Sequence, residues 1–75
     1  MHLLVFPKEH VPSVIDLQPE HATLIGKMII LAKDVAEERG IRDTGYKLVF
    51  NVGKHGNQTV KHVHLHLMGG KQLPE

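Results

Sequence analysis

The sequence contains no cysteine, which excludes disulfides, thiolate chemistry and cysteine-based zinc sites together. Long hydrophobic runs are also missing, and the longest apolar stretch, Met28 to Ala32, is far too short to span a bilayer. Neither charge is in clear excess, because nine Lys and Arg residues against eight Asp and Glu residues leave a formal net charge of +1. These absences argue against a membrane or a nucleic acid as a partner.

The length of the chain, 75 residues, limits the size of its core. A domain of this size buries only about 60% of the surface that its unfolded chain exposes, so it commonly relies on a metal or on association when disulfides are excluded. The hydrophobic fraction of 41% is too high for a disordered chain. Because Met1-His2-Leu3-Leu4 shows neither a basic leader nor a small-residue cleavage site, we expect no signal peptide and a cytoplasmic protein.

The clearest element in the sequence is a helix over residues 19–39. Apolar side chains recur there every three or four positions, in a stripe centred on Met28 and Leu31. Pro19 suits the first turn of a helix, where its missing N–H removes no hydrogen bond. Gly40 predicts a left-handed cap at the other end.

Three strands are expected around this helix. Residues 2–6 are apolar and partly β-branched or aromatic, and Pro7 ends that strand because proline cannot donate to a ladder. Residues 46–52 and 60–68 form the other two strands, on either side of a loop, 53–58, that contains two glycines. The order strand, helix, strand, strand predicts an α+β fold in which one long helix covers one face of a small, mainly antiparallel sheet.

The last predicted strand holds three of the seven histidines, in the run His62-Val63-His64-Leu65-His66-Leu67-Met68. Successive side chains of a strand point to opposite faces, so we expect the three histidines on one face and the aliphatic side chains on the other. The aliphatic face would pack against the helix, and the histidine face would point away from it, toward solvent or toward something absent from this chain. Neighbouring histidines would be about 6.6 Å apart along the strand.

Three interpretations of this histidine face remain open at this point. It could be an exposed polar face of no special chemistry. It could be a metal site, because two imidazoles on one face of a strand can converge on a zinc ion. It could also serve phosphoryl or nucleotidyl transfer, because a neutral imidazole can attack phosphorus and form a phosphoramidate that water later cleaves. The spacing alone does not separate the last two.

The histidine run resembles the His-φ-His-φ-His-φ-φ motif (φ is a hydrophobic residue) of the histidine-triad superfamily. The resemblance extends to Tyr46–Asn51, Gly56–Val60, Gly69-Gly70 and the opening residues 2–8, in the order and spacing of the second half of Hint-type nucleotide hydrolases. Gln58-Thr59-Val60-Lys61 would also suit the Fhit branch of dinucleoside polyphosphate hydrolases. The resemblance covers essentially the whole chain and implies one domain, residues 1–75, equivalent to the C-terminal half of the usual fold without its N-terminal segment.

The resemblance implies catalytic roles for four histidines. His64, the middle one of the run, would be the nucleophile that takes a nucleoside monophosphate onto its ring nitrogen. His66 would donate to the α-phosphate oxygens. His62 and His2 would support them by fixing the orientation and the tautomer of the neighbouring imidazoles.

Nucleotide and phosphate binding is implied for a further set of residues, which would act beside His64 and His66. Asn51 would add a contact to the α-phosphate, and Thr59 stands where the Hint branch often has serine, so its hydroxyl would bond the leaving group or the phosphate. The loop that includes Asn57 and Gln58 would offer backbone N–H groups as fixed donors. Asn57 stands where the family commonly has a second glycine, and asparagine tolerates a positive φ.

The activity implied by the resemblance is hydrolysis, or nucleotidyl transfer, at the α-phosphorus of purine nucleoside phosphoramidates or related nucleotides. It would pass through a covalent nucleotidyl-histidine and use neither a cofactor nor a metal. The alternative is a non-catalytic nucleotide-binding or dimerisation module, and a metal-binding module is a more distant third. Hint-type proteins are homodimers, so we expect a homodimer here, with Ile25, Ile29 and Ala32 as candidate contacts.

The remaining histidines have simpler interpretations. We expect His10 to be a structural or loop residue, His21 to be solvated in the first helical turn, and His55 to be exposed on the glycine-containing loop.

Overall fold

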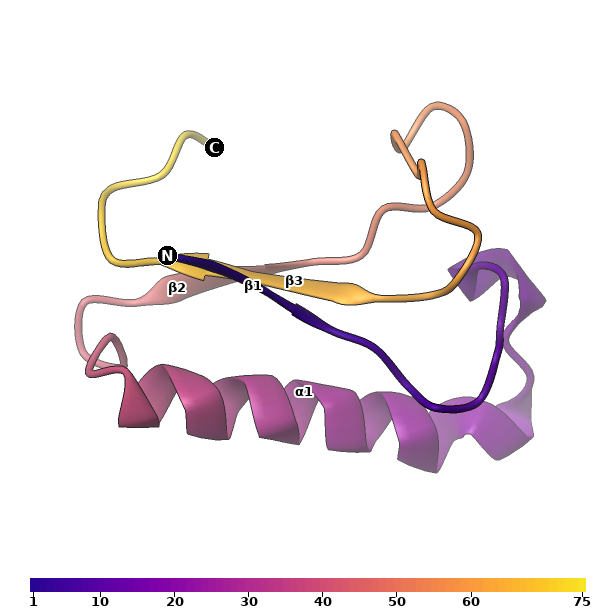
Figure 1. Ribbon diagram of the computed structural model, residues 1–75, viewed down its shortest axis with the longest axis horizontal. Helices are drawn as coiled ribbons and strands as arrows, with labels where there is room; N and C mark the ends of the chain where they lie inside the picture. The colour runs from indigo at the N-terminus through magenta and orange to yellow at the C-terminus, as the bar shows by residue number, and fades with distance from the viewer.

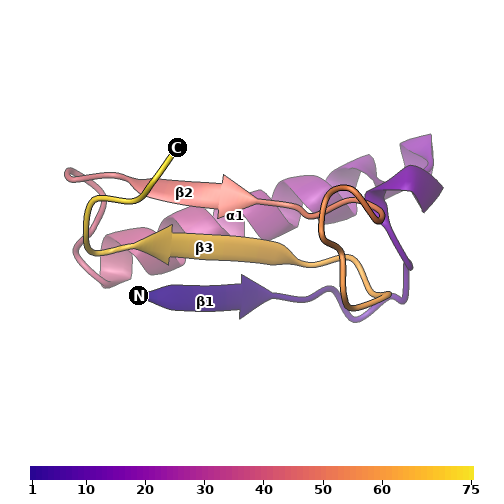
Figure 2. The ribbon, with the colours of Figure 1, turned by 90° about the horizontal axis from the view of Figure 1, so that it is seen from above.

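A computed structural model describes residues 1–75 and contains the predicted order of strand, helix, strand and strand. Its elements are β1 (His2–Val5), two 3-10 turns η1 (Val14–Asp16) and η2 (Pro19–His21), α1 (Ala22–Glu38), β2 (Tyr46–Val49) and β3 (Leu65–Gly69). The central strand is β3, and β1 and β2 flank it, both antiparallel to it. The helix lies along one face of this sheet (Figure 1), and the view from above shows the three strands side by side in front of it (Figure 2). The predicted α+β fold is confirmed.

The helix ends where the sequence predicted and begins slightly later. Pro19 starts a 3-10 turn, and regular α-helix follows only from Ala22. At the other end Gly40 has a φ of +75°, the left-handed conformation expected of a C-terminal cap. The α-helix therefore occupies 17 residues of the predicted span.

The face of α1 that packs on the sheet differs from the predicted stripe. Met28, Ala32 and Ala36 are buried, in a row at every fourth position, against Leu65 and Leu67 of β3. The alanines leave room for the helix to lie close to the sheet, since protein interiors tolerate few voids.

Leu31 was predicted at the centre of that stripe, but its side chain is 52% exposed. It lies about 100° around the helix from the fully buried Ala32, as the helical repeat requires of adjacent residues. The prediction that the stripe centres on Met28 and Leu31 is therefore right for Met28 and wrong for Leu31.

All three predicted strands were too long, the first by one residue and the other two by several. The ladder between β1 and β3 stops at the pair Val5–Leu65, and in the same register the next residues would bring Pro7 opposite Val63. Because proline has no N–H to donate, pairing ends there, and the Val63 N–H instead bonds the Val11 carbonyl at 2.6 Å. Residues 60–64 thus precede β3 rather than belonging to it, and residues 50–52 follow β2 as its loop begins.

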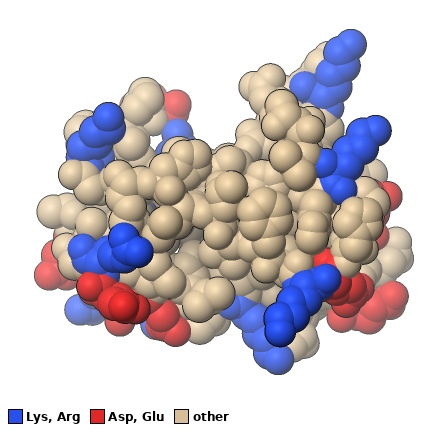
Figure 3. Space-filling model, in the orientation of Figure 1, with Lys and Arg blue, Asp and Glu red and all other residues tan.

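The surface carries few strong charge features. Charged side chains lie around the margins of the face shown in Figure 3, while uncharged atoms cover its middle. Lys33 on α1 pairs with Asp34 at 3.2 Å and with Glu37 at 3.7 Å. No helix of the chain combines the length and the hydropathy that crossing a membrane requires.

Candidate active site

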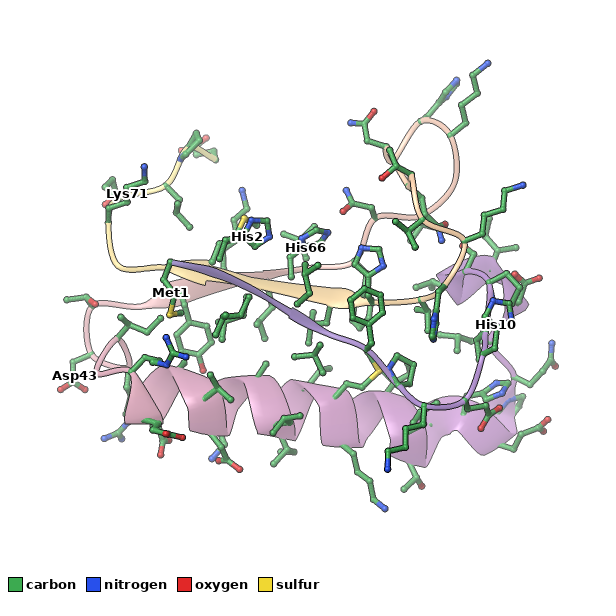
Figure 4. The ribbon with its side chains drawn as sticks, in the orientation of Figure 1. Met1, His2, His10, Asp43, His66 and Lys71 are labelled. Atoms are coloured by element: carbon green, nitrogen blue, oxygen red, sulfur yellow. The ribbon has the colours of Figure 1, made fainter.

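His66 and His2 lie on the face of the sheet that α1 does not cover. His66 is in the middle of the central strand, opposite Leu4 on β1 and Val49 on β2. His2 is two residues before Leu4 and therefore shares its face. Both imidazoles point away from the helix (Figure 4), and His2 Nε2 lies 2.7 Å from His66 Nδ1. One of these nitrogens must donate and the other accept, so the pair fixes the orientation of both rings.

His64 stands in the extended segment that leads into β3, and one hydrogen bond defines its tautomer. Its Nδ1 lies 2.8 Å from the backbone carbonyl oxygen of His62. A carbonyl oxygen can only accept, so Nδ1 carries the proton and donates it. The other ring nitrogen, Nε2, is then left with a free lone pair. This is the form of imidazole that can act as a nucleophile or a base.

The ring of His64 is more buried than a solvent-exposed histidine face would make it. Val63, Leu65 and Leu67 are all buried on the helix side, as the alternation predicted. His64 was expected to point away from the helix, toward solvent or toward something absent from this chain, and it is only 9% exposed. The reason is aromatic packing: the ring of Phe6 stacks on His64 with centroids 5.0 Å apart, and His66 meets it edge-on at 5.0 Å.

His62 is held by the N-terminal segment of the chain. Its Nε2–H donates to the Pro7 carbonyl at 3.1 Å, which leaves the lone pair on Nδ1. Its ring meets His10 edge-on at 5.1 Å and Phe6 at 5.5 Å. His10 in turn donates from Nε2 to the Lys61 carbonyl at 3.0 Å, so it has the structural role that the sequence suggested.

The glycine-containing loop is built around Asn51 and Gly56. The Asn51 side-chain amide donates to the Gly56 carbonyl at 2.7 Å and ties the loop to the end of β2. A Cβ atom on Gly56 would collide with the backbone of Val52, so only glycine fits there. Asn57 has a φ of +61°, the left-handed conformation that asparagine was expected to tolerate here.

Much of the donor capacity of this loop is already used within the chain. The backbone N–H of Asn57 bonds Lys54, and that of Gln58 bonds Gly53 at 3.0 Å. The Gln58 side chain accepts from the Gly53 N–H and donates to the carbonyls of Pro12 and Val60. The expectation of free backbone donors at these two positions is therefore corrected. The exposed Thr59 keeps an N–H with no acceptor in the chain.

The electrostatics of the site favour a neutral His66. Burial lowers the pKa of His66, and the neighbouring imidazoles of His64 and His2 lower it further. His66 is then neutral near pH 7. In the tautomer in which His2 donates to Nδ1, His66 keeps its proton on Nε2 and can donate it to a ligand.

Two histidines outside this row were given simple interpretations. His55 is exposed on its loop, as predicted. His21 was expected to be solvated, but its side chain is only 14% exposed. Its Nδ1 accepts from the Gln18 N–H at 2.8 Å, and its Nε2–H donates to Glu9 at 2.9 Å, so it caps the turn that leads into α1. Polar side chains three residues apart before an apolar run are a known sign of such a cap.

The arrangement as a whole places a free imidazole lone pair next to possible hydrogen-bond donors. The lone pair is that of His64 Nε2, with the neutral His66 beside it and Asn51 in the segment that follows β2. No group of three His, Asp or Glu side chains is arranged to hold a metal ion. Phe6, directly after β1, also contacts the site, which the local sequence pattern did not predict because only the strand register brings Phe6 to His64.

Comparison with known proteins defines the family. The family model described as "Scavenger mRNA decapping enzyme C-term binding" matches residues 1–74. The chain belongs to this family, which lies within the histidine-triad superfamily, as the resemblance had implied.

Individual relatives agree with this assignment. The chain is 43% identical over 72 residues to the purine nucleoside phosphoramidase of Escherichia coli (strain K12), which covers 96% of this chain and 60% of that protein. It is 44% identical over 69 residues to Protein HitA of Neisseria gonorrhoeae, covering 92% of this chain and 64% of that protein. The chain thus spans about three fifths of the length of the curated relatives it matches.

Solved structures show the same fold. A HIT family hydrolase from Legionella pneumophila Philadelphia 1 superimposes with a TM-score of 0.96 at 42% identity, over 99% of this chain and 66% of that chain. A histidine triad protein from Clostridium difficile superimposes with a TM-score of 0.94 at 36% identity, over 99% and 64% of the two chains. The histidine-triad fold predicted from the sequence is confirmed.

Proposed function

We propose that the chain is a cytoplasmic nucleotidyl hydrolase that cleaves purine nucleoside phosphoramidates, or related nucleotides, at the α-phosphorus. One observation carries the proposal: the hydrogen bond from His64 Nδ1–H to the His62 carbonyl, 2.8 Å long, which leaves the Nε2 lone pair free for attack. Similarity to a purine nucleoside phosphoramidase from Escherichia coli supports the choice of substrate. The proposal requires no metal and no cofactor.

The reaction proceeds in two displacements. In the first, the Nε2 lone pair of His64 forms a bond to the α-phosphorus, the bond from phosphorus to the leaving nitrogen breaks, and the leaving amine takes that electron pair together with a proton from solvent. His64 keeps its proton on Nδ1, so its ring carries a positive charge while the nucleotide is attached. In the second, water attacks the phosphorus, the N–P bond breaks, and a nucleoside monophosphate and a proton are released as His64 returns to its neutral form.

The other residues of the site would stabilise the charge on the phosphate and orient the reacting groups. Neutral His66 would donate from Nε2 to an α-phosphate oxygen, while His2 keeps that ring oriented through the 2.7 Å contact. Asn51 and Thr59 would contact the phosphate or the leaving group. His62 would support His64 through its backbone carbonyl, which its own bond to Pro7 helps to position. Positioning and charge stabilisation of this kind account for most of the rate enhancement in phosphoryl transfer.

The covalent intermediate provides the test. Wild-type protein mixed with an adenosine phosphoramidate and quenched within milliseconds in alkali, where phosphohistidine-type bonds survive, is expected to gain the mass of one adenylyl group on the peptide that contains His64. A His55→Ala protein serves as control, because His55 is an exposed loop residue, and it should be labelled equally. Binding of adenosine monophosphate with neither label nor turnover would favour the non-catalytic nucleotide-binding module instead.

We further propose that the chain forms a homodimer through the side of α1 that faces away from the sheet. Ile29, Ile30 and Leu31 are exposed there, around a shallow hollow of about 610 Å³. Gly26 borders the same hollow, and nothing lies within 4 Å of the position where its Cβ would be. A glycine inside a helix destabilises it by about 1 kcal/mol relative to alanine. A second helix packed closely against α1 at this position would account for the glycine.

The charges on this surface suit a second copy of the chain. Lys27 and Asp34 both border the hollow and lie one on each side of Ile30 along the helix. In a two-fold symmetric pair of antiparallel helices centred near Ile30, Lys27 of each copy would lie opposite Asp34 of the other. Of the three contacts suggested by the sequence, Ile29 fits this surface, whereas Ala32 is fully buried in the core and Ile25 packs against that core.

Replacement of one surface isoleucine tests the dimer. Ile30→Asp is expected to shift the protein to the monomer mass in light scattering at about 10 µM, because it would place two carboxylates at the centre of an apolar contact. The matched control is Ile15→Asp, since Ile15 is also strongly exposed but lies outside the helix, and it should leave the mass unchanged. A wild-type chain at monomer mass, with an unfolding midpoint independent of concentration, would contradict the proposal.

A further inference from the structure

Phe6 is a large apolar side chain that does not belong to either core cluster of the protein. The chain has two phenylalanines, and the other, Phe50, packs against the cluster of Met28, Ala32 and Leu65. Phe6 is instead 46% exposed and stacks on His64, with the centroids 5.0 Å apart and the ring planes at 23°. Its edge also meets His62, at 5.5 Å. The packing of Phe6 is therefore directed at the histidines.

The strand register explains why Phe6 reaches His64. Val5 pairs with Leu65, so Phe6 lies opposite His64 one residue beyond the ladder, and opposed residues share a face. Pro7 follows and accepts the hydrogen bond from His62 at 3.1 Å, which ties this end of β1 to the histidine segment. No helix covers this side of the sheet (Figure 1), yet His64 is only 9% exposed. The Phe6 ring covers one face of the imidazole.

We propose that Phe6 is a positioning residue for His64. It holds the plane of the imidazole so that Nδ1–H stays directed at the His62 carbonyl and Nε2 presents its lone pair, and its aromatic face favours the positive charge of the nucleotidyl-histidine. This inference rests on the proposed function, which supplies the charged intermediate. It adds a role to a residue that touches neither the phosphorus nor the leaving group.

The physical reason lies in the change of charge on His64 during the first displacement. The ring begins neutral, with one proton on Nδ1, and becomes cationic once Nε2 is bonded to phosphorus. The negative face of an aromatic ring attracts a cation that lies against it, and the attraction strengthens where water is excluded. The stack already exists while His64 is neutral, so the stabilisation develops as the transition state is reached and raises kcat rather than affinity.

The kinetic test compares two substitutions at Phe6 with one at Phe50. Phe6→Leu is expected to lower kcat by about 5- to 30-fold, which corresponds to the loss of one cation–π contact. KM should change by less than about twofold. Phe6→Tyr keeps an aromatic face and should stay within about twofold of wild type. Phe50→Leu makes the same change at a core position, so it should lower the unfolding midpoint and leave kcat near the wild-type value.

Nitrogen-15 spectra of the histidine rings test the positioning without any substrate. In Phe6→Leu, His64 is expected to populate both tautomers, whereas wild type and Phe50→Leu keep the proton on Nδ1. A Phe6→Leu protein with an unchanged His64 tautomer and an unchanged kcat would overturn the proposal. A wild-type protein that shows neither turnover nor label would overturn the proposed function, and these spectra would still decide whether Phe6 holds the imidazole.

Discussion

His64→Ala is expected to lower the turnover of an adenosine phosphoramidate by about a thousandfold or more and to abolish the covalent adenylyl label. The substitution removes the nitrogen that would attack phosphorus, and no second group can replace a nucleophile in a covalent mechanism. The fold should persist, because His64 packs on Phe6 and His66 and not in the core between α1 and the sheet. Turnover and circular dichroism on the same sample measure both expectations.

Chemical rescue separates a lost nucleophile from a damaged site. His64→Gly leaves a space between the rings of Phe6 and His66 that free imidazole can enter, so added imidazole should restore part of the turnover. His55→Gly provides the control, since that loop histidine is exposed and should neither lose activity nor respond to imidazole. Wild-type turnover in His64→Ala would refute the assignment of the nucleophile.

The local periodicity of the sequence was sufficient to predict which side chains of the histidine segment face the helix. Period-two alternation follows from the strand backbone itself, and Val63, Leu65 and Leu67 are indeed buried. It did not predict where β3 begins, because strand length depends on the partner strand. Pro7, which is far from Val63 in sequence, ends the pairing.

The orientation of α1 could be predicted only in part for a related reason. Its apolar residues form a stripe wide enough to include both Leu31 and Ala32, and hydrophobicity alone favours the leucine. The distance between helix and sheet decides the matter, because the small alanines allow close packing on Leu65 and Leu67. Leu31 is therefore left outside the core, on the surface that we propose for the dimer.

The residues of the candidate site were proposed from the sequence, whereas the packing over them and their tautomers were not. The family motif pointed to His64 and its neighbours, and the structure brings one proposed pair together, with His2 2.7 Å from His66. The stacking of Phe6 on His64 and the cap formed by His21 depend on contacts between segments far apart in sequence or on exact hydrogen-bond geometry. No local pattern of residue types carries that information.

Leu67→Ala is expected to lower the free energy of unfolding by about 3 kcal/mol, the second large effect that the structure predicts. Leu67 is fully buried against Ala36 and Ile41 in the core between α1 and the sheet. Its truncation therefore leaves a cavity that the surrounding strands cannot fill. A domain of this length has a total stability of about 4–11 kcal/mol. The loss should lower the thermal midpoint by about 12–24 °C in a calorimetric or circular dichroism melt.

The control for this prediction is Leu4→Ala, which makes the same chemical change in a neighbouring strand of the same sheet. Leu4 is half exposed on the open face opposite His66, so its truncation leaves no closed cavity and should cost less than about 1 kcal/mol. Because both substitutions remove the same side-chain atoms, the difference between them measures chiefly the burial of Leu67 against α1. Both melts should use one protein concentration, since the proposed dimer would make the midpoint depend on it. Equal midpoints for the two proteins would show that Leu67 is not in a close-packed core, and the helix-on-sheet packing described above would be wrong at its centre.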